Sequence, residues 1–286
     1  MCVQGIKKSI LVAAIDIGLE LKFLIGFWRN RPRPGSHNLV VSMTSYPARI
    51  RWSWLALESI FRQDYRDFTL VLVLSREQFR GVRLPRRIRL QMRKGLQILW
   101  VDEDNKSYDH LWPAYEKFPR SRIISVDDDK FFPPNLLSEL VAQSDRTPDK
   151  IVAARGWEMR MNGGLLNFGD NWVRATLDSP SDILFLPPGN GSLYPVDSLP
   201  AMAGDTRTMR EVCPNADDVW YWAMARLNGT SSVCLGLSPH RPIWRQKGTP
   251  ALADNDPGPR EFQSVMSFFG LRERVIAQIV EGDKKS

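Results

Sequence analysis

The chain has 286 residues, of which 43% are hydrophobic and 25% are charged. This composition is typical of a globular protein with a packed core, and it excludes global disorder. The formal net charge of +7 favours anionic partners such as nucleotides, nucleic acid or an acidic membrane surface. Because the sequence contains no DNA- or RNA-binding motif, we expect no nucleic-acid partner.

The three cysteines are Cys2, Cys213 and Cys234. Their number is odd and their spacing is not that of a CxxC motif, so they predict neither a structural zinc site nor a disulfide framework. This pattern favours a reducing compartment, and we expect a cytoplasmic protein, with the inner face of the plasma membrane as a second location.

Residues 9–28 are mostly apolar, but Asp16, Glu20 and Lys22 interrupt them. These charges argue against a membrane-spanning helix and against a cleaved signal peptide. Two interpretations remain: a helix that packs on the protein's own core or on a partner, and a helix that lies on a membrane surface. In the second interpretation, acidic lipid heads would meet three arginines that follow the helix, namely Arg29, Arg31 and Arg33.

From residue 38 onward, apolar runs with the length of buried strands alternate with helical patterns. Buried strands are expected at residues 38–43, 68–74, 96–100 and 122–126, and helices at residues 51–63 and 108–117. Residues 79–90 are basic and contain proline, which favours surface structure. Alternation of strands and helices predicts an α/β fold with a Rossmann-like, mostly parallel sheet flanked by helices.

The second half has a less regular pattern, with glycine- and proline-rich loops typical of hairpins. It predicts a smaller mixed region, with a strand-like run at residues 192–195 and helices at residues 217–227 and 261–280. We therefore divide the chain into an N-terminal helix and basic linker, a main domain, and a C-terminal helix and tail. These parts cover residues 1–34, 35–250 (a nucleotide-binding half 35–134 and an acceptor half 135–250) and 251–286.

Polar clusters follow three of the expected strands. They begin at Thr44, Asp102 and Asp127. In open α/β sheets, ligands bind beyond the carboxyl ends of the strands, near the switch in strand order. We therefore expect these clusters to meet in one binding site.

The run from Asp127 to Asp129 directly follows the strand expected at residues 122–126. If strand geometry continues, Asp127 and Asp129 point the same way, because alternate side chains share a face. Two adjacent carboxylates suit Mg²⁺ or Mn²⁺, which are commonly held by one or two carboxylates together with substrate phosphates. A cation there would stabilise a diphosphate leaving group. A solvated turn is the alternative interpretation.

Three motifs in this order carry a resemblance to a known family. They are residues 42–50 (SMTSYPARI), residues 104–114 (DNKSYDHLWPA) and, after the acidic triplet, residues 216–220 (ADDVW) followed by Asn228-Gly-Thr230. Together they resemble bacterial family-2-like glycosyltransferases with the GT-A fold and a DxD-type motif, which use nucleotide sugars. The resemblance covers about residues 38–230. It implies transfer of a sugar, in an inverting reaction, to a hydroxyl of a glycan or glycolipid acceptor in polysaccharide biosynthesis.

The resemblance also implies roles for individual residues. Asp129 and Asp127 would hold the metal, with His240 as a further ligand, although a histidine with no metal role is an equally good interpretation of His240. The nucleotide sugar would contact Thr44, Tyr46, Arg49, Asp104, Lys106, Asp127, Asp128 and Gly191.

Asp217 and Asp218 are the candidate catalytic pair. Sugar hydroxyls are weak nucleophiles and benefit from a positioned carboxylate, so one of the two would act as general base. Both stand at an expected helix start, where acidic residues also serve as caps. We predict that Asp218 is the base and that the other residue caps the helix.

Glycines at positions 189 and 191 would let the backbone approach the donor sugar or the acceptor closely, and an ordinary turn is the alternative. Two further function classes compete with glycosyl transfer. A metal-dependent phosphatase or hydrolase would use the Asp triplet, but the residue two beyond Asp129 is Phe131 rather than the threonine that the DxD phosphatases need. A non-catalytic nucleotide- or sugar-binding module stays an open alternative; loss of the acid at 129 or 218 would have favoured it, and both acids are present.

Overall fold

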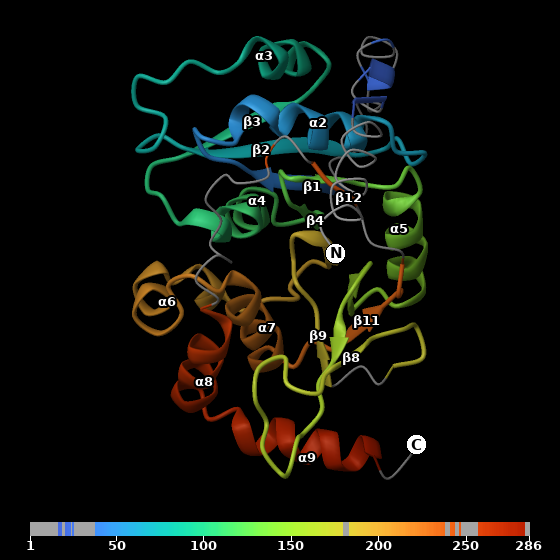
Figure 1. Ribbon diagram of the computed structural model, residues 1–286, viewed down its shortest axis with the longest axis vertical. Helices are drawn as coiled ribbons and strands as arrows, with labels where there is room; N and C mark the ends of the chain where they lie inside the picture. Colours follow the sequence, from blue (N-terminus) through green and yellow to red (C-terminus); the bar gives the residue numbers. More distant parts are fainter. Residues whose placement is uncertain are drawn as a thin grey trace, which may run out of the picture.

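The structure is a computed structural model that describes residues 17–18, 21–23, 25, 38–179, 183–237, 241–243, 246 and 257–283. Figure 1 shows a central sheet with helices on both of its faces. The helices are α2 (Ile50–Phe61), α3 (Arg86–Arg93), α4 (Trp112–Lys117), α5 (Leu136–Arg146), α6 (Thr206–Val212), α7 (Asp217–Leu227), α8 (Gly258–Phe268) and α9 (Arg272–Asp283), with 3-10 turns η1 (Lys106–His110) and η3 (Ala201–Gly204).

The central sheet has seven strands in the order β11-β6-β10-β4-β1-β2-β3. The strands are β1 (Leu39–Thr44), β2 (Thr69–Ser75), β3 (Gln97–Val101), β4 (Arg122–Val126), β6 (Ile151–Ala153), β10 (Asn190–Tyr194) and β11 (Ser232–Cys234). Only β10 among them runs antiparallel to its neighbours, β4 and β6. The predicted fold class, a mostly parallel sheet flanked by helices, is confirmed.

Two small sheets complete the described strands. One pairs β5 (Lys130–Phe131) with β12 (Arg241–Pro242), and the other joins β7 (Trp157–Glu158) to β8 (Val173–Arg174) and β9 (Leu184–Phe185). Strands from both predicted halves enter the seven-stranded sheet, so the boundary at residue 134 divides one sheet and remains a proposed functional division.

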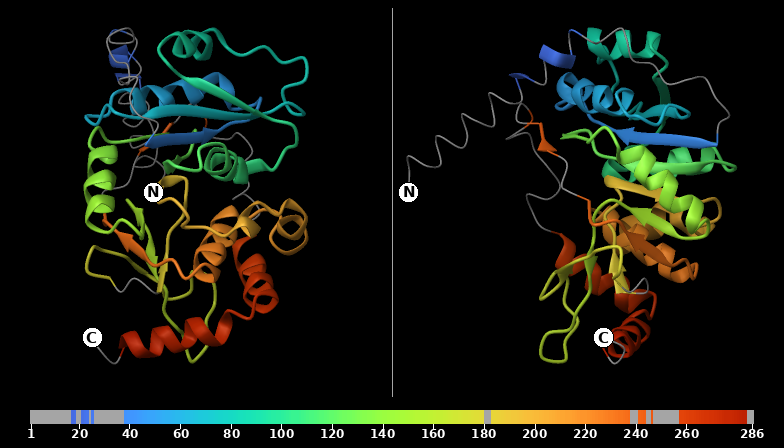
Figure 2. Two further views of the ribbon diagram at one scale, coloured as in Figure 1. Left: turned by 180° about the vertical axis from the view of Figure 1, so that it is seen from behind. Right: turned by 90° about the vertical axis from the view of Figure 1, so that its right-hand side faces the viewer.

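Successive side chains of the parallel strands point into two hydrophobic cores, one on each face of the sheet. On β1, Val41 and Met43 pack with α2, α3 and α5, whereas Val40 packs on the opposite face with α4 and α7. This alternation follows from strand geometry, in which successive side chains point to opposite faces. Figures 1 and 2 show the same division, with α2 and α3 above the sheet and α4, α6 and α7 below it.

The strand order switches direction at β1. The chain runs from β1 outward to β2 and β3, then returns to β4 on the other side of β1. β1 and β4 are in parallel register, with Met43 beside Val126. The loops that leave these two strands therefore open next to each other, at the crevice where α/β sheets bind ligands.

Residues 79–90 lie mostly at the surface, as expected, and α3 begins within them at Arg86, directly after Pro85. Two expectations about helices need correction. The helix expected at residues 108–117 is divided into η1 and α4. The last helix is divided into α8 and α9 at Gly270, which has a positive φ of 62° that ends a helix.

Described residues of the N-terminal segment, among them Phe23, are helical and contact the main body. Phe23 is buried, its ring lies edge-on to Phe131 at 5.7 Å, and Arg62 donates hydrogen bonds to the carbonyls of Lys22 and Phe23. Phe23 therefore packs on the main body, and the interpretation of the segment as a membrane-surface helix is left open by this contact. Within the described ranges, no helix is long and apolar enough to cross a membrane.

Candidate functional site

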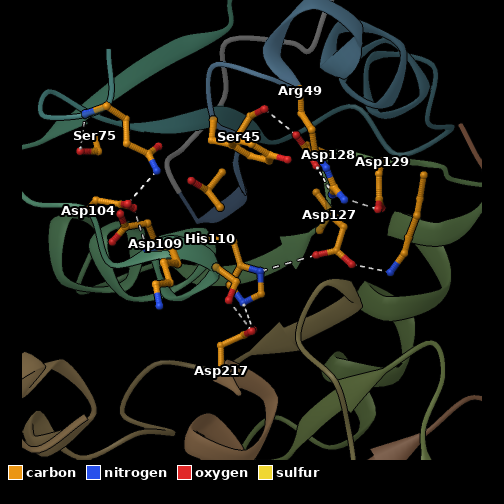
Figure 3. A pocket seen from close by; sticks show the side chains of 17 residues that line it. Ser45, Arg49, Ser75, Asp104, Asp109, His110, Asp127, Asp128, Asp129 and Asp217 are labelled. Carbon is orange, nitrogen blue, oxygen red and sulfur yellow. Dashed lines mark hydrogen bonds and ion pairs between the residues drawn. The ribbon is translucent and has the colours of Figure 1, made fainter. Parts of the chain in front are cut away.

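A cavity of about 540 Å³ opens at the carboxyl ends of β1, β2 and β4 (Figure 3). All three polar clusters predicted from the strand ends contribute to it or to its rim. Its lining consists of Thr44, Ser45, Tyr46, Arg49, Ser75, Gln78, Asp104, Lys106, Ser107, Asp109, His110, Val126, Asp127, Asp128, Asp129, Lys130 and Asp217.

Asp128 joins the triplet to the loop after β1. Its Oδ2 accepts hydrogen bonds from the hydroxyls of Ser45 (2.5 Å) and Ser53 (2.9 Å). The residue is buried, and this burial raises the pKa of its carboxyl to about 6. Asp128 thus holds the turn after β4 against the start of α2, and its two neighbours in the triplet lie on the cavity wall.

Arg49, the residue just before α2, extends its side chain toward the acidic triplet. Its guanidinium is 3.1 Å from Oδ2 of Asp129 and 3.4 Å from Oδ1 of Asp128. The other carboxylate oxygen of Asp129, Oδ1, is buried and has no hydrogen-bond partner among the described residues. A buried acceptor without a partner costs free energy, so this oxygen is suited to receive a ligand.

Asp127 has two cationic neighbours. Lys130 donates a short hydrogen bond to its Oδ2, and Nδ1 of His110 lies 3.8 Å from its Oδ1. Although burial by itself raises the pKa of Asp127, these two neighbours outweigh it and hold the pKa below its usual range. Asp127 is therefore an anion at neutral pH.

Gly189 makes room for this carboxylate. A Cβ at position 189 would lie 1.8 Å from Oδ1 of Asp127, a distance that atoms do not adopt. The carbonyl of Gly189 also accepts a hydrogen bond from the backbone N–H of Asp127 (2.8 Å). At Gly189 the group that lies close to the backbone is therefore the Asp127 carboxylate.

His110 connects the two halves of the site. Its Nε2 lies 3.1 Å from Oδ2 of Asp217, as an ion pair rather than an aligned hydrogen bond, and Ser107 donates to Oδ1 of Asp217 at 2.6 Å. Burial alone would lower the pKa of His110, but Asp217 and Asp127 outweigh it and raise the pKa to about 9. Figure 3 shows the imidazole between Asp127 and Asp217.

Asp218, the predicted general base, is half-buried and does not line the cavity, whereas Asp217 does. Neither residue is the N-cap of α7, which is Ala216. Oδ1 of Asp218 accepts a hydrogen bond from the backbone N–H of Val219 (2.9 Å). Burial and then the charge of Asp217 raise the pKa of Asp218 to about 7.

Asp104 and Lys106 form the rim next to β2 and β3. Gln78 donates to Oδ2 of Asp104 (2.7 Å), and the backbone N–H of Lys106 donates to its Oδ1 (2.8 Å). Lys106 has a positive φ of 58°, and its Nζ donates to Oδ1 of Asn215 (2.6 Å), just before α7. The contact between Lys106 and Asn215 is thus a second link, besides His110, between the loop after β3 and the start of α7.

The structure brings nine of the predicted site residues to the cavity, but not Gly191 or Asp218. Gly191 has a φ of 90°, and a Cβ there would contact Leu136 instead. His240 lies outside the described residues. The nine are Thr44, Tyr46, Arg49, Asp104, Lys106, Asp127, Asp128, Asp129 and Asp217.

Sequence reasoning missed His110 and Lys130. Both stood next to residues that we singled out: His110 lies within the motif of residues 104–114, and Lys130 follows the triplet directly. The available signal was the place of Lys130 directly after three acidic residues, and for His110 only its place within that motif.

The described side chains alone do not complete a site for a divalent cation. Among the described residues, no group of three or more His, Cys, Asp or Glu side chains is arranged to hold a metal ion. Asp127 and Asp129 nevertheless both line the cavity, and Oδ1 of Asp129 has no partner there. This donor set matches Mg²⁺ or Mn²⁺, which take few protein carboxylates and complete their shell with phosphate and water oxygens.

Comparisons with known proteins support the fold class. No protein-family model matches the chain, and no curated protein does. Among solved structures, S. aureus TarS 1–349 in complex with UDP-GlcNAc has a TM-score of 0.51 and 12% identity, over 86% of this chain and 72% of that one. A mannosyltransferase from Pyrobaculum calidifontis in complex with GDP-Man and Mn²⁺ has a TM-score of 0.32 and 18% identity, over 51% and 46%. The likeness at 12% identity shows a shared fold, in agreement with the predicted GT-A type.

Proposed function

We propose that this chain is a glycosyltransferase that moves a sugar from a nucleotide-diphosphate sugar to a hydroxyl of a glycan or glycolipid acceptor. The observation that carries the proposal is the placement of Asp127 and Asp129 on the wall of a cavity at the switch point of the sheet. This is where a diphosphate is expected in an α/β fold. The complex of the TarS fragment with UDP-GlcNAc supports the same ligand class in a protein of similar fold.

In this proposal, Asp129 and Asp127 hold Mn²⁺ or Mg²⁺ together with the donor diphosphate. The cation, when bound, stabilises the charge that develops on the departing nucleoside diphosphate. Asp129 contributes the oxygen that has no partner among the described residues, Oδ1. Arg49 keeps Asp129 in place through Oδ2 and leaves Oδ1 for the ligand.

In this proposal, the rim formed by Asp104 and Lys106 binds the nucleoside. Asp104 lies across the cavity from the triplet, held by Gln78 and by the backbone of Lys106 (Figure 3). Its carboxylate suits the hydroxyl and N–H donors of a ribose and a base. Tyr46, whose ring lies 5.7 Å from the Arg49 guanidinium, adds an aromatic wall.

Asp218 is the general base in this proposal and Asp217 a positioning residue. Asp217 is already neutralised by His110, whereas the hydrogen bond of Asp218 is to the backbone N–H of Val219. A pKa of about 7 suits a group that must accept a proton at neutral pH and release it afterwards. Asp218 removes the proton from the acceptor hydroxyl as the oxygen attacks the anomeric carbon, and the nucleoside diphosphate departs from the opposite face, which inverts the centre.

The proposal is tested by incubating the protein with UDP-, GDP-, CMP- and dTDP-sugars, each with Mn²⁺, with Mg²⁺ and with EDTA. We expect nucleotide release, by hydrolysis or by transfer to added glycans, from one nucleotide class and only with a cation. If no combination releases or binds a nucleotide, the proposed function is wrong.

A further inference from the structure

The segment around α3 is strongly basic. Six arginines fall between positions 80 and 93, and no acidic residue occurs from Gln78 to Val101. Five of the arginines have exposed side chains, so their charge faces solvent. They are Arg80, Arg83, Arg86, Arg89 and Arg93.

α3 has a defined inner face, which orients these charges. Ile88 is fully buried, and Gln91 donates to the carbonyl of Trp54 on α2 at 2.9 Å. The side chains of Arg86, Arg89 and Arg93 lie about one helical turn apart from one another on the opposite side. Met92, 41% exposed, adds an apolar group beside them.

The helical residues of the N-terminal segment expose an apolar stripe. Ile17, Leu21 and Ile25 follow one another at intervals of four and are 49%, 54% and 85% exposed. Phe23, which is buried against Phe131, points about half a turn away from that stripe. The segment therefore packs with one side and presents three large aliphatic side chains with the other.

A buried carboxylate links α3 and the N-terminal segment through α2. On α2, Oε1 of Glu58 accepts from Arg62 (3.2 Å), which holds the carbonyls of Lys22 and Phe23. Oε2 of Glu58 accepts from Lys94 (2.7 Å), the C-cap of α3. Figures 1 and 2 show α3 and the N-terminal segment at the same end of the molecule, above α2.

We propose that this end of the molecule docks on a membrane surface that contains anionic lipids. The stripe of Ile17, Leu21 and Ile25 would enter the boundary between head groups and acyl chains, and the α3 arginines would bind lipid phosphates. Guanidinium groups pair with phosphate oxygens bidentately. A nucleic acid would use the arginines but would leave the aliphatic stripe in water, so the combination favours lipid. The proposal goes beyond the proposed function and does not depend on it.

The test is sedimentation of the full chain with phosphatidylcholine vesicles and with vesicles that contain phosphatidylglycerol as well. Two triple variants probe the surface: Arg86→Gln/Arg89→Gln/Arg93→Gln and Ile17→Ser/Leu21→Ser/Ile25→Ser. Each has a matched control at the far end of the molecule. The controls are Arg207→Gln/Arg260→Gln/Arg274→Gln and Leu165→Ser/Leu177→Ser/Phe268→Ser, all at exposed positions.

We expect binding to the anionic vesicles alone, and weaker binding as salt shortens the screening length. Since each arginine near the surface contributes about fivefold to partitioning, the arginine triple variant should lose roughly a hundredfold. The aliphatic variant should lose binding as well, and both controls should bind as the wild type does. Thermal melting confirms that each variant is folded.

Three outcomes would overturn the proposal: equal binding to neutral and anionic vesicles, an equal loss in the arginine variant and its control, or no vesicle binding by the wild type. Binding of the wild type to duplex DNA or RNA in place of vesicles would indicate nucleic acid instead. None of these results bears on nucleotide-sugar turnover, which is measured separately.

Discussion

Nε2 of His110 lies 3.1 Å from Oδ2 of Asp217, and this ion pair joins the loop after β3 to the first residue of α7. The other side of the same imidazole faces Asp127 at 3.8 Å. One buried histidine therefore lies between a carboxylate of the acidic triplet and the acidic pair that opens α7. The donor side and the acceptor side of the proposed site share this residue.

Replacing His110 with glutamine should lower the free energy of unfolding, because both Asp127 and Asp217 lose their cationic neighbour. Glutamine keeps a polar side chain but cannot carry the charge that balances Asp127 and Asp217. Breaking a buried ion pair costs about 3–5 kcal/mol, and the partial exposure of both carboxylates places the expected loss at the lower end of that range. Urea unfolding measures it.

A double-mutant cycle supplies the control for His110. If the ion pair is the cause, His110→Gln combined with Asp217→Asn should be less destabilised than the sum of the two single variants. Additive effects would show that His110 acts through packing instead.

Gly189→Ala should displace Asp127. The new Cβ would lie 1.8 Å from the present position of Oδ1, so the carboxylate must leave that position. We expect a loss of nucleotide-sugar turnover of roughly a hundredfold in a protein that still folds, because small displacements of a positioning group have effects of that size. Gly18→Ala is the matched control, since a Cβ there meets nothing within 4 Å. Full activity of Gly189→Ala would show that Asp127 has no part in the reaction.

The stability of the protein should fall as the pH rises from about 4 to about 6, in part because of Asp109. Burial raises the pKa of Asp109 to about 6 in spite of its hydrogen bonds from Asn105, whereas the unfolded chain titrates near 3.8. In this window the folded state holds the proton and the unfolded state has lost it, so the free energy of unfolding decreases with pH. Two pKa units correspond to about 3 kcal/mol at most.

Asp109→Asn isolates this contribution, because asparagine does not titrate. The difference in unfolding free energy between the wild type and the variant should change across pH 4–6 and be constant above pH 7. A difference that does not vary with pH would mean that Asp109 titrates normally in the folded protein.

Asp218→Asn should stop transfer and spare donor binding. A positioned base contributes about 10²–10⁴-fold to a reaction of this kind. Asp217→Asn is the matched comparison, because it changes the neighbouring carboxylate and removes the partner of His110. Donor affinity by titration and transfer rate should separate the two residues. If Asp217→Asn alone stops transfer at full donor affinity, the base is Asp217.

Local sequence patterns were sufficient for the frame of the fold. The strand expected at residues 122–126 is β4 with the same bounds, and the strands expected at residues 38–43 and 68–74 begin and end within one residue of β1 and β2. Each is a short apolar run in a buried parallel sheet, where nearly every side chain is enclosed and the pattern is strongest. Because these strands were placed correctly, the acidic triplet after residue 126 was also placed correctly, at the carboxyl end of β4.

Contacts between distant segments were not accessible from these patterns. The packing of Gly189 against Asp127 and the position of His110 between Asp127 and Asp217 depend on how the chain returns through β10 and α7. Helical rotation of about 100° per residue separates Asp217 from Asp218, so only the three-dimensional placement of α7 decides which one faces the cavity. The end of α8 did have a signal in the sequence, namely Gly270 itself, because glycine commonly follows the last residue of a helix.

The most direct measurement of the central claim is calorimetric titration of the nucleotide-sugar series into the protein with Mn²⁺ and with EDTA. The wild type should bind one donor class at least roughly tenfold more tightly with the cation, since carboxylate and diphosphate oxygens bind it jointly. Asp129→Asn should lose this difference, whereas Asp102→Asn, whose side chain is 92% exposed, should retain it. Donor binding that is unaffected by the cation in the wild type, or an Asp129→Asn protein that responds as the wild type does, would contradict the account.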